Sequence, residues 1–130
     1  MANIPENLQY TREHEWLMPQ SPTARVGITD FAQRQLGDIV FVELPRPGDR
    51  FEAGEPFGTV ESVKSVTELY LPVAGTVTEV NTALNDSPED CNTDPYGDGW
   101  LIEIQPSAPA ELKNLLTPKQ YQDYIAEESG

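Results

Sequence analysis

The chain has 130 residues, and its eight lysines and arginines against 22 aspartates and glutamates give a formal net charge of −14 at pH 7. Nucleic acids and anionic membranes bind basic surfaces, so neither is expected as a partner. Such acidity is typical either of an ordinary solvated face or of a docking surface for basic partner proteins. The length fits a single domain over residues 1–130 that needs no disulfide or metal to fold.

A single cysteine, Cys91, excludes an internal disulfide, so the sequence carries no mark of an oxidising compartment. The first residues have neither a basic start nor an apolar run, which argues against a signal peptide. No apolar stretch approaches the ~18 residues that a membrane span requires. We therefore expect a soluble cytoplasmic monomer, or a protein of the mitochondrial matrix if a transit peptide has been removed.

The first third of the chain predicts short strands at residues 8–10, 15–17 and 25–28. A short helix is expected next, capped by Thr29 or Asp30 and ended by Gly37 in a left-handed conformation. The mostly apolar run at residues 39–44 then predicts another strand, which Pro45 ends.

Proline- and glycine-rich turns frame three further strands, at residues 57–63, 66–71 and 76–80. One helical turn is expected around Pro88, capped by Asp86 or Ser87, followed by a strand at 100–104. Apolar residues at helical spacing return after Ala110, and Thr117 restarts a second helix. The prediction is a mainly β fold with short helices. A flattened antiparallel barrel or sandwich over about 8–105 is covered by C-terminal helices over about 109–127.

Lys64 is the only lysine or arginine between Phe51 and Leu112, a span that holds twelve acidic residues. A lone cation in such surroundings invites a functional interpretation, although most exposed lysines are ordinary solvated surface.

The spacing of Val63 and Val66 is that of partners closing a two-residue hairpin loop, with Lys64 and Ser65 at the tip. Turn chemistry favours Asn-Gly or Asp-Gly at such a tip, so Lys-Ser suggests selection for another purpose. The same register makes two further pairs, Val60–Leu69 and Glu61–Glu68.

Several blocks of the sequence together resemble the H-protein family of the glycine cleavage system, whose members carry lipoate. The blocks are HEW at 14–16, VGITDFAQRQLGDIVFVELP at 26–45, ESVKSV at 61–66, PVAGTVTEVN at 72–81 and DPYGDGWLIEI at 94–104. The resemblance runs from about Tyr10 to Tyr124 and implies a barrel–sandwich hybrid like that of lipoyl and biotinyl carriers.

In this family the lysine of the E-S-V-K block holds lipoic acid in amide linkage, and the matching residue is Lys64. The attaching enzymes of the family read a glutamate three residues before the lysine and a glycine eleven after it, which are Glu61 and Gly75. An exposed hairpin tip is a suitable root for an arm that must reach other active sites. Taken alone, Glu61 is a surface acid and Gly75 a turn glycine.

The resemblance implies a carrier that is a mobile substrate of partner enzymes and not itself an enzyme. A pyridoxal-phosphate glycine decarboxylase would load an aminomethyl group onto one lipoyl sulfur, and a tetrahydrofolate-dependent aminomethyltransferase would remove it. Dihydrolipoyl dehydrogenase would then reoxidise the arm by thiol–disulfide chemistry. A lipoate-attaching enzyme is the fourth expected partner, and the cofactor supplies the chemistry while the protein supplies position.

In family structures the loaded arm folds back beside carboxylates, and the matching positions are Glu15, which follows His14, and Glu68. The family usually has aspartate at the second position, so Glu68 keeps the charge and lengthens the reach. A carboxylate facing an ammonium group contributes little unless the pair is partly desolvated.

His14 and Cys91 also permit a nucleophile–base pair of a small hydrolase. We favour a His14 that packs beside Trp16 and a Cys91 that is a small buried thiol. The acidic segment 85–99 lacks the spacing of a calcium loop and is interrupted by prolines, so no metal site is predicted.

Two further alternatives stay open. The chain fits, less well, a lipoyl or biotinyl domain of another multienzyme complex, but biotin domains flank their lysine with methionines, whereas Val63 and Ser65 flank Lys64. It also fits an unmodified acidic adaptor with the same fold, which the intact E-S-V-K block disfavours.

Overall fold

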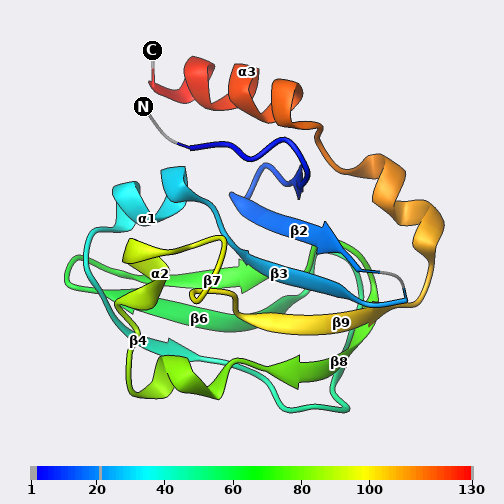
Figure 1. Ribbon diagram of the computed structural model, residues 1–130, viewed down its shortest axis with the longest axis horizontal. Helices are drawn as coiled ribbons and strands as arrows, with labels where there is room; N and C mark the ends of the chain where they lie inside the picture. Colours follow the sequence, from blue (N-terminus) through cyan, green and yellow to red (C-terminus); the bar gives the residue numbers. More distant parts are fainter. Residues whose placement is uncertain (1–2, 21, 130) are drawn as a thin grey trace.

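The computed structural model describes residues 3–20 and 22–129 and consists of two antiparallel sheets that face each other (Figure 1). The larger sheet has the strand order β1 (Gln9–Tyr10), β2 (Glu15–Pro19), β3 (Ala24–Ile28), β9 (Ile102–Pro106), β8 (Gly75–Val80) and β5 (Arg50–Phe51). The smaller sheet has the order β4 (Ile39–Glu43), β6 (Pro56–Ser62) and β7 (Val66–Tyr70). The sheets are not closed into a barrel, so the predicted fold class is confirmed in its sandwich form.

Five short helices complete the described part of the chain: α1 (Asp30–Leu36), the 3₁₀ helix η1 (Thr82–Asn85), α2 (Asp90–Thr93), the 3₁₀ helix η2 (Pro109–Asn114) and α3 (Pro118–Ser129). Within the same residues, none of these helices has the length and hydropathy that crossing a bilayer requires. The predicted C-terminal helical cover corresponds to η2 and α3, which follow the last strand.

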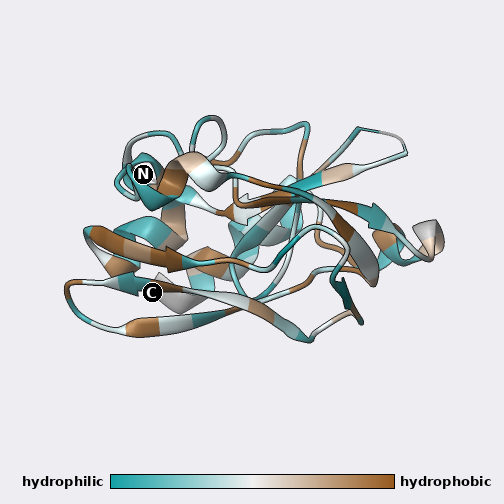
Figure 2. Ribbon diagram, turned by 90° about the horizontal axis from the view of Figure 1, so that it is seen from below, coloured by the Kyte–Doolittle hydropathy of each residue, from teal (hydrophilic) through white to brown (hydrophobic). Residues whose placement is uncertain are grey.

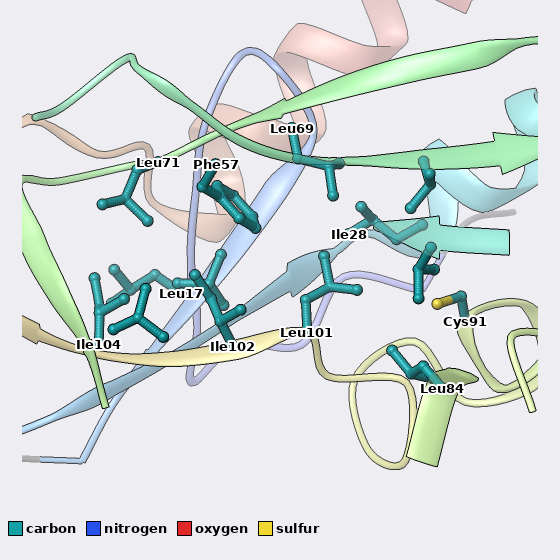
Figure 3. Close-up of a cluster of buried hydrophobic side chains, with 14 of the residues drawn as sticks. Leu17, Ile28, Phe57, Leu69, Leu71, Leu84, Cys91, Leu101, Ile102 and Ile104 are labelled. Carbon is teal, nitrogen blue, oxygen red and sulfur yellow. The ribbon is translucent and has the colours of Figure 1, made fainter. Parts of the chain in front are cut away.

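The main core fills the space between the two sheets (Figure 3). Leu17, Ile102 and Ile104 project from the larger sheet toward Phe57 and Leu69 of the smaller one, and each is almost completely buried. Burying a side chain of this size contributes about 1.5–3 kcal/mol. Alternation along the strands therefore fixes which face of each sheet points inward.

A second cluster lies on the opposite face of β2, where α3 covers the sheet (Figure 1). Trp16 points into this cluster while its neighbour Leu17 points into the main core, so β2 is buried on both faces. The rings of Tyr10 and Tyr121 stack with centroids 4.6 Å apart. Tyr10 and Leu116 also exchange two backbone hydrogen bonds of 3.0 and 2.7 Å, which tie the C-terminal segment to β1.

The helix signals of the sequence are largely confirmed. Thr29, and not Asp30, caps α1 by accepting a 3.1 Å hydrogen bond from the N–H of Ala32, and Gly37 ends the helix at a φ of 82°. Because only glycine adopts this conformation without strain, Gly37 fixes the direction in which the chain enters β4.

The start of α3 is a capping box. The hydroxyl of Thr117 accepts from the N–H of Gln120 at 3.1 Å, and the Gln120 side chain accepts from the N–H of Thr117 at 3.0 Å. Pro118 is the first helical residue, where its missing N–H costs nothing.

The helical turn predicted around Pro88 is found as α2, which begins at Asp90, two residues after Pro88. Its predicted cap by Asp86 or Ser87 is wrong, because the N-cap residue is Glu89 and makes no side-chain capping bond. The sequence did not predict η1, which ends at Asn85. Each of these short helices buries one side chain completely, Leu84 and Cys91 respectively. Burial of these two residues, and not the local capping chemistry, decides where the helices lie.

The hydroxyl of Tyr121 joins α3 to the rest of the fold, because it is hydrogen-bonded to Thr29 at 2.7 Å and to Nδ1 of His14 at 2.9 Å. We expect Tyr121→Phe to lower the free energy of unfolding by about 1–3 kcal/mol, since it removes a buried hydroxyl from two partners. The control is Tyr124→Phe, whose hydroxyl donates one exposed 3.3 Å bond to the carbonyl of Arg12. Urea unfolding should show a change below about 0.5 kcal/mol for the control. Equal effects of the two substitutions would contradict this role of Tyr121.

Candidate functional site

Lys64 lies in the loop between β6 and β7, which projects from one end of the molecule, and its side chain is exposed (Figure 1). The loop is organised around Ser62, whose side chain is buried. The Ser62 hydroxyl accepts from the N–H groups of Lys64 and Ser65 at 3.1 and 3.2 Å, and the Ser62 N–H donates to the Ser65 carbonyl at 2.8 Å. Serine is therefore the residue that holds the backbone of the lysine in place.

The predicted register of this hairpin is wrong by two residues. Glu61 pairs with Val66 and Val60 pairs with Thr67, so Val63 and Val66 are not partners. The N–H of Val63 donates instead to the carbonyl of Asp38, 3.1 Å away, at the entrance to β4. A third strand thus overrides the local pairing preference.

The register of the rest of the hairpin follows from this shift. The observed pairs are Gly58–Leu69 and Thr59–Glu68, in place of Val60–Leu69 and Glu61–Glu68. Spacing alone did not identify Ser62, although a serine whose hydroxyl bonds to N–H groups two and three residues later is a known turn signal.

The turn between α1 and β4 forms a platform under the stem of Lys64. A methyl group added to Gly37 would lie 3.4 Å from Cε of Lys64, so the lysine methylenes cross directly over this glycine. The side-chain amide of Asn92 fixes the turn by donating to the carbonyl of Gly37 and accepting from the N–H of Ile39, both at 2.9 Å. The root of the side chain therefore rests on a rigid surface.

A pocket of about 270 Å³ lies at the other end of β7, where Tyr70 is one of its walls. It is lined by residues of the β1–β2 turn, the end of β7 and the C-terminal segment, including Thr11, Glu15, Tyr70, Leu71, Leu115 and Leu116. The pocket thus combines an apolar wall with one buried carboxylate.

Glu15 is this buried carboxylate, with only 1% of its surface exposed. One oxygen accepts from the hydroxyl of Thr11 at 2.9 Å, and the other accepts from the N–H of Tyr70 at 3.0 Å. Burial raises the pKa of Glu15 to about 8, although both hydrogen bonds act in the opposite direction. Burial therefore favours the neutral form of Glu15, whereas a cation beside it would favour the charged form.

Glu68 lies on the exposed face of β7, two residues before Tyr70 and hence on the same side of the strand. The two side chains are close enough that the charge of Glu68 raises the pKa of the Tyr70 phenol. Glu68 is therefore at the edge of the pocket that Glu15 lines, and β7 connects Lys64 to both acids.

Glu61 and Gly75 occupy different sheets. Glu61 is exposed on β6 beside the hairpin loop, whereas Gly75 is buried on β8 of the larger sheet. A Cβ on Gly75 would lie 2.8 Å from the carbonyl oxygen of Gln105, so the neighbouring backbone requires glycine here. Gly75 is therefore not a turn glycine, as the sequence suggested. It lies within β8 and allows the neighbouring strand to pack closely.

His14 and Cys91 are not brought together. His14 lies among the rings of Phe31, Tyr121 and Tyr124, with centroids 4.9, 5.8 and 5.8 Å away. Cys91 is completely buried in the main core, and burial raises the pKa of its thiol to about 12. The interpretation of Cys91 as a buried thiol is confirmed, and the nucleophile–base pair is wrong.

Trp16 lies in the second cluster, with its ring centroid 6.0 Å from that of Tyr96 and its N–H donating to the Pro95 carbonyl at 3.0 Å. The immediate ring neighbours of His14 thus come from α1 and α3.

Across residues 3–20 and 22–129, no three His, Cys, Asp or Glu side chains gather in a way that could hold a metal ion.

Comparison with known proteins identifies the family to which this small β sandwich belongs. The family described as Glycine cleavage H-protein matches residues 8–128. A glycine cleavage system H protein from Rubrobacter xylanophilus is 56% identical over 128 residues, covering 98% of this chain and 99% of the relative. One from Halalkalibacterium halodurans is 52% identical, covering 98% of this chain and 100% of the relative.

A solved structure gives the same result. The crystal structure of a glycine cleavage system H protein from Mycobacterium marinum superimposes with a TM-score of 0.84 at 43% identity, covering 98% of this chain and 100% of that one. The chain therefore belongs to the glycine cleavage H-protein family.

The pKa of Glu15 makes stability depend on pH. The pKa rises from an ordinary 4.5 to about 8 on folding, so the folded state holds the proton more tightly than the unfolded state. This contribution is complete below about pH 4.5 and is lost as the pH rises through about 8. We expect Glu15→Gln, which imitates the neutral acid, to reduce the loss of stability between pH 5 and pH 8 by a few kcal/mol.

The control for this measurement is Glu79→Gln, which removes an equivalent charge from an exposed residue of β8 that does not line the pocket. Urea unfolding at the two pH values should give parallel curves for this control and the unsubstituted protein. If Glu15→Gln also runs parallel to them, the buried carboxylate does not titrate in this range.

Proposed function

We propose that this protein is the lipoyl carrier of a glycine cleavage system, with lipoate in amide linkage on Lys64. The observation that carries the proposal is the exposed Lys64 on a hydrogen-bonded hairpin tip, in a chain of the glycine cleavage H-protein family. When bound, lipoate would supply a dithiolane that accepts an aminomethyl group on one sulfur and is closed again by oxidation.

The partners that follow are the pyridoxal-phosphate glycine decarboxylase, the tetrahydrofolate-dependent aminomethyltransferase and dihydrolipoyl dehydrogenase, together with the enzyme that attaches lipoate. The protein acts as their shared substrate and is not itself an enzyme. Its own residues supply position: the bonds to Ser62 fix the backbone of Lys64, and the platform at Gly37 supports the stem.

The residues around the pocket suit an ammonium cargo. Glu15 offers a buried carboxylate, Glu68 adds a second negative charge at the edge, and Leu71 and Leu116 form part of an apolar wall that excludes water. A desolvated carboxylate binds a cation more strongly than an exposed one does. His14 would act indirectly, because its hydrogen bond to Tyr121 supports the turn that carries Glu15.

Trypsin tests the attachment site directly, because acylation removes the charge that trypsin needs. An unmodified chain should yield the peptides 51–64 and 65–113, whereas a modified chain should yield one peptide, 51–113, heavier by one lipoyl group. Reduction should add two alkylatable thiols to that peptide. Lys64→Arg should abolish the added mass, since a guanidinium keeps the charge but cannot form the amide.

The matched control is Lys119→Arg, which changes another exposed lysine, on α3. This variant should be modified like the unsubstituted protein, and both variants should unfold within about 0.5 kcal/mol of it. Clean cleavage after Lys64 in protein from a lipoate-competent host would reject the carrier function and favour the unmodified adaptor.

The two acids should lengthen the lifetime of the loaded aminomethyl group. We expect Glu15→Gln and Glu68→Gln each to speed its non-enzymatic release roughly three- to tenfold, as loss of a partly shielded ion pair predicts. Glutamine is the better substitution at Glu15, because alanine would leave the N–H of Tyr70 without its acceptor.

Release is measured by mass spectrometry of the loaded protein over time. The control is Glu79→Gln, which removes an exposed acid from β8, a strand that contributes no residue to the lining of the pocket. Equal lifetimes in all three variants and the unsubstituted protein would show that neither acid protects the cargo.

A further inference from the structure

Glu15 is a buried carboxyl whose hydrogen-bond donors among the described residues are both neutral. Figure 2 shows hydrophobic and hydrophilic segments alternating along the strands, as expected of sheets with one covered face. Glu15 departs from this pattern, because it is 1% exposed and is held only by the hydroxyl of Thr11 and the N–H of Tyr70. Buried charges in proteins are normally paired, so this carboxyl is available to a cation that enters the pocket.

The hydroxyl of Thr11 has its hydrogen-bonding roles fixed by the turn between β1 and β2. Its oxygen accepts from the N–H groups of Glu13 and Glu15 at 3.1 and 3.2 Å, which occupies both lone pairs of a hydroxyl oxygen. The single hydroxyl hydrogen is left to donate to Oε1 of Glu15, 2.9 Å away. Thr11 therefore cannot accept a hydrogen bond from the carboxyl of Glu15.

The backbone of this turn holds the hydroxyl in place. The N–H of Thr11 donates to the carbonyl of Glu15 at 3.0 Å, and the N–H of His14 donates to the carbonyl of Thr11 at 3.2 Å. His14 has a φ of 67°, a conformation for which short hairpin loops generally use glycine. Its ring packs against those of Phe31 and Tyr121, which holds the turn against the fold despite this strain.

The carboxyl of Glu15 has two lone pairs already occupied. Oε1 accepts from the hydroxyl of Thr11, and Oε2 accepts from the N–H of Tyr70 at 3.0 Å, so one lone pair on each oxygen faces a group that can only donate. A proton on neutral Glu15 must use one of the two lone pairs that remain. Glu15 lines the pocket, and an ammonium group there would donate to the same two positions. The proton and the cation therefore compete for one carboxyl.

We propose that Thr11 is a positioning residue for an ammonium cargo in the pocket. By donating to Oε1 it stabilises the ionised carboxyl of Glu15 and leaves the remaining lone pairs to the cargo, which takes the place of a proton. The exchange is one for one. The O–H bond of the neutral carboxyl breaks, the proton passes to solvent, and the ammonium group donates a hydrogen bond to the carboxylate. This role rests on the function proposed above, whose aminomethyl group is the cargo.

The other titratable groups around the pocket do not offer the same exchange. The phenol pKa values of Tyr10 and Tyr70 are raised, by burial and by the charge of Glu68 respectively, so neither phenol releases a proton near neutral pH. The charge of Glu13 adds to burial in raising the pKa of Glu15. Glu15 is also the one carboxyl of the set that is fully buried, so its proton is the one that an entering cation meets. The set comprises Tyr10 of β1, Arg12, Glu13 and Glu15 at the turn, Glu68 and Tyr70 of β7, and Glu111 of η2.

The first test follows the carboxyl carbon of Glu15 by NMR in the full, unmodified chain, with Glu15→Gln to assign its signal. We expect methylammonium chloride to lower the pH midpoint of Glu15. The shift should be about 0.3 unit at a concentration equal to its dissociation constant and about 1 unit at ten times that concentration. Tetramethylammonium chloride is the control, because it carries the same charge but has no N–H to donate. Equal midpoints in the two salts would overturn the exchange.

The second test uses Thr11→Val, which removes the hydroxyl and keeps the shape of the side chain. The ionised carboxyl then loses one donor, so the midpoint of Glu15 should rise by about one pH unit, and methylammonium should bind roughly tenfold more weakly at pH 7. This weakening should nearly vanish at about pH 9.5, where the proton has largely left in both proteins. A purely structural role of Thr11 would weaken binding equally at the two pH values and would overturn the proposal.

Two further variants serve as controls. Thr11→Ser keeps the hydroxyl and should restore both the midpoint and the affinity. Thr78→Val on β8 removes a hydroxyl that donates to Oε1 of Glu103 at 3.0 Å, and it should leave the midpoint of Glu15 unchanged. An unchanged midpoint in Thr11→Val would remove the positioning role.

Circular dichroism shows whether each variant is folded. If Thr11→Val is not folded, Thr11→Cys, which keeps a weaker donor, should raise the midpoint in its place, and an unchanged midpoint there is equally decisive against the role. None of these titrations requires lipoate. An unmodified Lys64 in the trypsin assay therefore rejects the proposed function without altering these titrations, and the two failures are distinguishable.

Discussion

The link between Glu15 and the N–H of Tyr70 is the constraint on which the functional surface depends. Glu15 belongs to β2 of the larger sheet and Tyr70 to β7 of the smaller one, so a single 3.0 Å hydrogen bond joins the two layers beside the pocket. Burying a carboxylate is costly, which is why its pKa is raised to about 8. The position is therefore poorly optimised for stability and well suited to a cation.

β7 connects the two parts of the candidate site. It begins next to the loop that holds Lys64 and ends at the wall of the pocket, with Glu68 between them. Because both ends are fixed, by Ser62 at one and Glu15 at the other, the distance between the backbone of Lys64 and the pocket is set by the strand. A reach fixed by a rigid element is more reproducible than one fixed by a loop.

The sequence predicted those structural features that depend on hydrogen bonds between residues close together in the chain. The cap at Thr29, the left-handed Gly37 and the helix start at Thr117 all follow from hydrogen bonds within a few residues. The hairpin register was missed because the carbonyl of Asp38, just before the third strand β4, accepts from the N–H of Val63. The bulge at Val40 and the two-residue strand β5 were missed for the same reason, since each exists only through its partner strand.

The pairing of Tyr10 with Leu116 has a consequence for synthesis of the chain. The smaller sheet uses only residues 39–70, and Asn92, which fixes the turn under Lys64, follows soon after, so every residue of this surface leaves the ribosome before Leu115. The pocket also needs Leu115 and Leu116, and the aromatic cluster above β2 needs Tyr121 and Ile125, which emerge last. A nascent chain therefore displays the proposed attachment surface before the pocket proposed to shelter a cargo can form.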